Sequence, residues 1–134
     1  MIALDTNVLV RFIVRDDERQ AEAATRLMED RCTAETPGIV SPVVLCELVW
    51  VLTSGYGYKR EMVVRVLRRI LTVRELQVQN PALMLRAVKL FEEGPADFAD
   101  YLIGLSNREA KADATFTFDG KAAKSDLFRL LEGV

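Results

Sequence analysis

Five acidic residues stand at the ends of apolar segments or alone inside them, and these are the side chains that could do chemistry. They are Asp5, Glu47, Asp97, Asp100 and Asp119. Several carboxylates crowded into a partly dry pocket cannot all stay ionised without a cation. Hard divalent ions such as Mg²⁺ suit an oxygen-only site, and a bound ion activates water and neutralises charge on a phosphoryl oxygen. If the five side chains meet, the pattern predicts metal-dependent cleavage of a phosphate ester.

The composition narrows the other possibilities. The chain contains no histidine, which removes Ser-His-Asp and Cys-His catalysis and the usual zinc sites. A net charge of −2 argues against a strongly basic nucleic-acid binder. The two cysteines, Cys32 and Cys46, lack zinc-ligand spacing and are expected to be reduced thiols of a cytoplasmic protein. We find no apolar run long enough to cross a bilayer and no signal peptide, so no membrane association is expected.

The strands that must position two of the acids can be read from short apolar segments. Residues 2–4 predict a buried strand that runs into Asp5, and helical spacing follows over residues 8–13. Residues 115–118 alternate as a strand does, and they lead directly into Asp119. In an α/β chain that closes on one parallel sheet, both acids fall at the carboxyl edge, where ligands bind. A length of 134 residues predicts a single domain, 1–134, of this α/β class.

Glu47 is the single charge in the apolar run of residues 43–52. Ser41 and Pro42 mark the start of this helix as N-cap and first helical residue. The helix is apolar all round, which predicts that it is buried. A carboxylate there needs a cation partner or a proton. We therefore interpret Glu47 as a metal-site residue, with a Glu satisfied by a local Arg or by backbone donors as the alternative.

Asp97 and Asp100 are three residues apart at the start of a predicted helix, so they share one face of it. Like charges at this spacing disfavour a helix, and a cation between them would reverse that effect. As capping residues alone they would be unremarkable. Residues 16–18 are also acidic and open an earlier helix, where we interpret them as capping and solvated residues.

A helix beginning at Lys59 has one apolar and one basic face. The predicted apolar stripe is Met62, Val63, Val66, Leu67, Ile70 and Leu71, and the basic face is Lys59, Arg60, Arg65, Arg68 and Arg69. The basic face is either solvated or a contact for RNA phosphates or an acidic partner. A half-buried strand is predicted over residues 73–78, and a further helix from Asn80 and Pro81 to Gly94.

Four motifs occur in a familiar order: L-D-T-N, S-P-x-x-x-x-E, D-F-A-D-Y-L-I and T-F-D. With this order and spacing the chain resembles the PIN domain, and within it the VapC-type toxins, the ribonuclease halves of prokaryotic toxin–antitoxin pairs. The resemblance implies a three-layer α/β/α PIN-like fold with a central, mostly parallel sheet. It also implies RNA cleavage that depends on Mg²⁺ or Mn²⁺ and leaves a 5′-phosphate. The implied partners are a second copy in a homodimer and a VapB-like antitoxin, which inserts a segment against the acidic pocket.

The resemblance assigns roles residue by residue. The first, second and fourth family acids match Asp5, Glu47 and Asp119. The third matches Asp100, although Tyr101 replaces the usual small residue after it, and Asp97 is the alternative one turn earlier. By this match the metal ligands are Asp5, Asp100 and Asp97. The groups that orient carboxylates and water are Thr6, Asn7, Ser41 and Thr117.

Two other functions are alternatives to the nuclease. A phosphatase could use Asp5 as its nucleophile, but Asn7 stands where such enzymes need a general acid. A non-catalytic domain could bind RNA or a partner through the same acids, although loss of one or more acids would then be expected.

Overall fold

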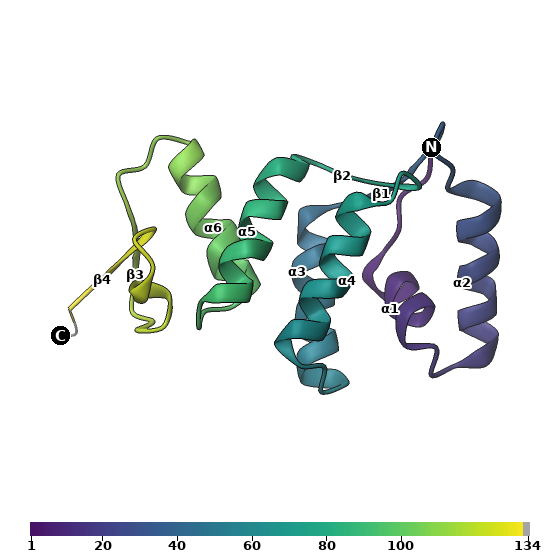
Figure 1. Cartoon of the computed structure of the whole chain (residues 1–134), viewed down its shortest axis with the longest axis horizontal. Coiled ribbons are helices and arrows are strands. Elements are labelled where there is room, and N and C mark those ends of the chain that lie inside the picture. Colours follow the sequence, from purple (N-terminus) through teal and green to yellow (C-terminus); the bar gives the residue numbers. More distant parts are fainter. Residues whose placement is uncertain (133–134) are drawn as a thin grey trace. The chain divides into compact units, whose positions relative to one another are not determined.

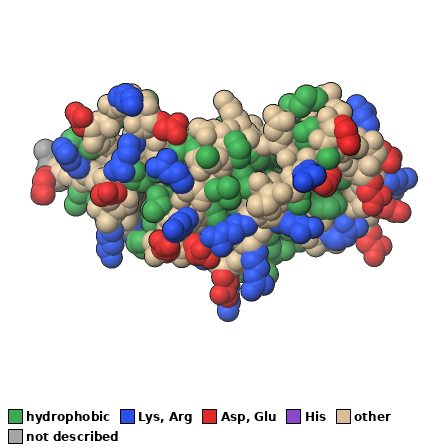
Figure 2. All heavy atoms as spheres, turned by 45° about the horizontal axis from the view of Figure 1, so that its top comes forward, with side chains coloured by type: hydrophobic (Ala, Val, Ile, Leu, Met, Phe, Trp, Pro, Cys, Tyr) green, Lys and Arg blue, Asp and Glu red, His purple; other side chains and the backbone are tan. Residues whose placement is uncertain are grey.

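The computed structural model describes residues 1–132 and forms two compact units, Met1–Pro81 and Ala82–Val134 (Figure 1). Each unit combines helices with a pair of short parallel strands. The α/β class predicted from the sequence is therefore confirmed. No helix within residues 1–132 is both long enough and apolar enough to span a membrane. Figure 2 shows basic and acidic side chains interspersed on the face that it draws, in line with the small net charge of −2.

The first unit holds most of the helices. Its elements are α1 (Thr6–Val14), α2 (Glu18–Arg31), β1 (Gly38–Val40), α3 (Pro42–Trp50), a π-helical turn (Val51–Gly55), α4 (Arg60–Thr72) and β2 (Leu76–Val78). β1 and β2 pair in parallel, with Gly38 opposite Leu76. The predicted N-terminal strand is reduced to one parallel bridge between Ala3 and Ile39.

Local capping explains where these helices begin. The Asp17 side chain accepts a hydrogen bond from the Gln20 N–H (3.0 Å) and caps α2, as predicted for this acidic stretch. Asp16 instead accepts a hydrogen bond of 2.7 Å from the Tyr56 hydroxyl and forms an ion pair with Arg11. These contacts fasten the loop after the π-helical turn to the junction between α1 and α2.

The second unit is built from two helices and a second strand pair. Its elements are α5 (Pro81–Glu93), α6 (Phe98–Glu109), β3 (Thr115–Thr117), a 3₁₀ helix (Ala122–Lys124) and β4 (Phe128–Leu130). Phe91 and Phe98 pack edge to face, with ring centroids 6.1 Å apart. The Tyr101 hydroxyl accepts a hydrogen bond from the Ala96 N–H at 3.2 Å, which fixes the connection between α5 and α6.

Two expectations about burial need correction. α3 is not buried all round, because Val43 is 68% exposed and Trp50 is 69% exposed, while Leu45 and Leu48 are fully buried. One face of α3 packs inward and the other carries exposed apolar groups. On α4 the predicted apolar stripe is wrong near the start of the helix. Met62, which was expected to be buried, is 43% exposed, and Val64, which was not part of the stripe, is buried.

Candidate functional site

Asp5 lies where the chain passes from extended backbone into α1. Its φ and ψ of −82° and 163° are extended, and its Oδ1 accepts a hydrogen bond from the Thr6 N–H at 2.7 Å. A carboxylate at a helix N-terminus is stabilised by the unpaired N–H groups there. The side chain remains exposed, so it is available to a ligand.

Glu47 is joined to this position through Thr6. Thr6 is 8% exposed, and its hydroxyl donates a hydrogen bond of 2.8 Å to Glu47 Oε1. The structure thus brings Asp5 and Glu47 to the two sides of one buried threonine. The prediction that Glu47 is buried and needs a cation or a proton is wrong, because Glu47 is exposed on α3. Within residues 1–132 it is the Thr6 hydroxyl, and no Lys or Arg, that contacts this carboxylate.

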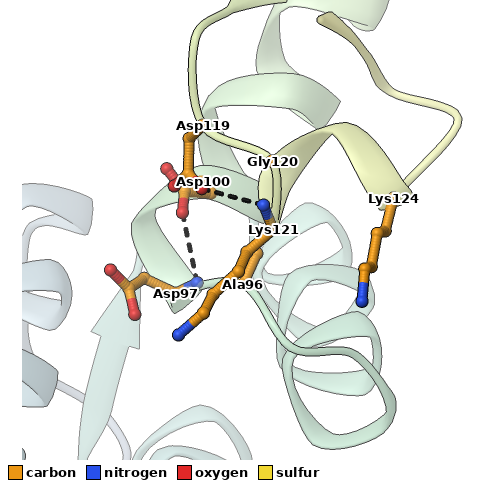
Figure 3. Close-up of a pocket in the computed structure, with 7 residues that line it drawn as sticks. All are labelled: Ala96, Asp97, Asp100, Asp119, Gly120, Lys121 and Lys124. Carbon is orange, nitrogen blue, oxygen red and sulfur yellow. Dashed lines mark hydrogen bonds between the residues drawn. The ribbon is translucent and has the colours of Figure 1, made fainter.

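The second unit gathers the other three acids in one cavity of about 600 Å³, which we call the aspartate pocket (Figure 3). Its lining residues are Ala96, Asp97, Asp100, Asp119, Gly120, Lys121 and Lys124. Figure 3 shows Asp97 and Asp100 coming from the start of α6, and Asp119 from the segment after β3.

Backbone hydrogen bonds hold the three aspartates in place. Asp97 is the N-cap of α6, and its N–H donates to Asp100 Oδ2 at 3.2 Å. The Asp119 N–H donates to Thr117 Oγ1 at 3.0 Å, and Asp119 Oδ1 accepts from the Lys121 N–H at 2.9 Å. Thr117 therefore holds the start of the segment that carries Asp119.

The electrostatics of the aspartate pocket disfavour the ionised form of Asp100. Partial burial raises the pKa of Asp100 above its ordinary value, and the negative charges of Asp97 and Asp119 raise it further, while the hydrogen bond from the Asp97 N–H opposes the shift. The charges of Asp97 and Asp119 therefore each disfavour the ionised form of Asp100. A bound cation would relieve that repulsion.

The other predicted residues have separate positions. The Ser41 hydroxyl accepts from the Val44 N–H at 3.2 Å and caps α3, and Asn7 is exposed on α1. Lys59 is the N-cap of α4, and Arg60 is half-buried. The remaining basic residues, Arg65, Arg68 and Arg69, are exposed.

Sequence reasoning missed two features. Arg65 and Arg69 border a largely apolar cavity of about 740 Å³ in the first unit, lined from α1, α2, α4 and β2. Lys121 and Lys124 line the aspartate pocket. The only sequence signal for them is that they follow Asp119, at the end of a predicted strand, by two and five residues.

The donor chemistry of these residues suits a hard divalent ion, because every candidate ligand is a carboxylate oxygen. Within residues 1–132, however, no group of three or more Cys, Asp or Glu side chains is arranged so that it could hold a metal ion. The chemical type of the ligands therefore fits Mg²⁺ or Mn²⁺.

Comparison with known proteins identifies the family. A family profile described as the PIN domain matches residues 2–126, so the chain belongs to the PIN-domain family. This agrees with the α/β/α PIN-like fold predicted from the sequence. The chain is also similar to a VapC ribonuclease of Aquifex aeolicus (strain VF5), with 29% identity over 102 residues, which is 76% of this chain and 75% of that protein. No solved structure matches significantly.

Proposed function

We propose that this protein is a metal-dependent endoribonuclease and the toxin of a toxin–antitoxin pair. The observation that carries the proposal is the crowding of Asp97, Asp100 and Asp119 in one pocket of a PIN-domain chain. The matched range, residues 2–126, includes all five acids, which supports treating the chain as a single PIN domain. Similarity to a protein named VapC ribonuclease supports RNA as the substrate.

Each acid has a distinct task in this proposal. Asp5, Asp100 and Asp97 would hold Mg²⁺ or Mn²⁺, which when bound activates water and neutralises charge on the phosphate. Glu47 and Asp119 complete the set of acidic groups around the reacting phosphodiester. Thr6 holds the Glu47 carboxylate at 2.8 Å, so that its orientation is set before substrate arrives.

The partners follow from the same family relationship. We infer an RNA substrate, a VapB-like antitoxin that binds the toxin, and a homodimer as the assembly. The exposed basic residues of α4, Arg65, Arg68 and Arg69, are candidates for contacts with RNA or with an acidic partner.

Cleavage of RNA by the purified protein tests the activity. With Mg²⁺ the unaltered protein should cut single-stranded RNA and leave 5′-phosphates, which sequencing of the RNA ends detects. Asp5→Asn should abolish cleavage, whereas Asp30→Asn, which removes an equal charge from an exposed position on α2, should leave it unchanged. RNA that stays intact with the unaltered protein, while the protein still binds it, would favour the non-catalytic alternative.

Expression in a bacterial host tests the toxin assignment. The intact chain should stop growth, Asp5→Ala should not, and a small protein encoded beside it should restore growth by binding the toxin. Growth that continues during expression of stable, intact protein would contradict the assignment.

A further inference from the structure

We propose that Lys121 and Lys124 bind phosphates of the RNA backbone, one each, at the rim of the aspartate pocket. The inference rests on the proposed function, since it assigns two substrate-positioning residues to that activity. It starts from the presence of two lysines among the residues that line a cavity with three aspartates.

The backbone that carries the two lysines is fixed, while their side chains are exposed. The Lys121 N–H donates to Asp119 Oδ1 at 2.9 Å, so the start of this segment is tied to a pocket acid. Between the lysines, Ala122 is 1% exposed and anchors the 3₁₀ helix in the unit's core. Both lysine side chains remain exposed. The segment therefore presents its ammonium groups from a backbone that is tied to the pocket.

The two side chains border the pocket from different sides. In Figure 3, Lys121 extends along Ala96 toward Asp97, and Lys124 extends on the opposite side of Ala96. Within the described part of the second unit, residues 82–132, neither ammonium forms an ion pair with a pocket aspartate. Among these described residues, their charge is thus not neutralised by an aspartate of the pocket.

These ammonium groups can offset the repulsion between the pocket and a negatively charged substrate. Three aspartates repel a polyanion, and a single divalent ion would offset only part of their negative charge. A lysine ammonium is a compact point charge that binds phosphate oxygens readily. Two of them at the rim would each hold a backbone phosphate and place a neighbouring phosphodiester over the acids.

RNA binding without divalent metal tests this inference separately from cleavage. Fluorescence anisotropy with a labelled single-stranded RNA in EDTA gives the dissociation constant over a range of KCl concentrations. The slope of log Kobs against log salt should shrink by about 0.7 for each lost phosphate contact. Lys121→Gln and Lys124→Gln should each show this change, and the double variant about twice as much.

Lys89→Gln is the matched control, because Lys89 is exposed on α5 and does not line the aspartate pocket. Its salt slope should equal that of the unaltered protein. With Mg²⁺ present, the double variant should raise KM and change kcat little.

A wild-type salt slope in the double variant would overturn the inference, as would a failure of the unaltered protein to bind RNA at all. If the slopes change as expected but the unaltered protein does not cleave RNA with Mg²⁺, the proposed activity fails and the phosphate contact stands.

Discussion

The hydrogen bond between Thr6 and Glu47 allows a direct test of whether Thr6 orients the Glu47 carboxylate. Thr6→Val removes the hydroxyl that donates to Glu47 Oε1 at 2.8 Å and keeps nearly the same shape in a site that is 8% exposed. Hydrogen bonds to charged groups contribute about 1.5–3 kcal/mol. Because Glu47 is exposed and can bond to water instead, we expect a loss of only about 1 kcal/mol in the free energy of unfolding.

The effect of Thr6→Val on catalysis should exceed its effect on stability. Loss of a group that orients an active-site side chain typically costs about 10–100-fold in activity. Urea denaturation would measure the stability, and single-turnover cleavage of RNA would measure the rate. Thr6→Ser keeps the hydroxyl and should cleave at close to the wild-type rate. Equal rates for Thr6→Val and Thr6→Ser would refute the orienting role of this contact.

Three further predictions concern the second unit and the metal. Burial and two neighbouring charges raise the pKa of Asp100 above 3.8 in the folded state, so stability is lost as pH rises from about that value through the folded pKa. Asp100→Asn should therefore have a higher Tm than the unaltered protein at neutral pH, and this difference in Tm should vanish in acid. A difference in Tm that stays constant across pH would contradict the raised pKa of Asp100. Gly104→Ala should destabilise the protein by about 1–3 kcal/mol, because its new Cβ would lie 2.8 Å from Leu127 Cβ, whereas Gly120→Ala, which meets nothing within 4 Å, should change the urea midpoint little. EDTA should stop RNA cleavage and added Mn²⁺ should restore it, whereas cleavage that continues in EDTA would rule out the metal dependence.

Local sequence signals predicted the helix starts well. Asp17 and Ser41 cap their helices through hydrogen bonds that reach only three residues along the chain, so the information is contained in a short segment. The strand ends were also visible, because β3 stops just before Asp119. Helix caps and strand ends depend on residues that are close along the chain, so they can be predicted from a short stretch of sequence.

Burial could not be read from the sequence in the same way. The apolar run around Glu47 suggested a helix enclosed on every side, yet Trp50 and Val43 on α3 are exposed. Which face of a uniformly apolar helix packs inward depends on the elements that cover it, and those lie far along the chain. The partner of Glu47 was hidden for the same reason, since Thr6 is 41 residues away in sequence.

The chemistry of the candidate site was only partly visible. Acidic residues were conspicuous because a charge at the end of an apolar strand has few structural uses. Lys121 and Lys124 did not stand out in the sequence, because exposed lysines near turns are common in proteins. Their place in the aspartate pocket follows from the turn after β3, which directs the segment back beside α6.

Whether Asp5 and Asp119 serve one reaction is tested most directly by a double-mutant comparison of RNA cleavage. Asp5→Asn in the first unit and Asp119→Asn in the second should each lower the single-turnover rate with Mg²⁺ by more than about 100-fold. Residues that act as a unit are strongly non-additive, so the double variant should be little slower than either single variant. A wild-type rate in either single variant, or a double variant whose loss is the product of the two, would contradict a shared reaction.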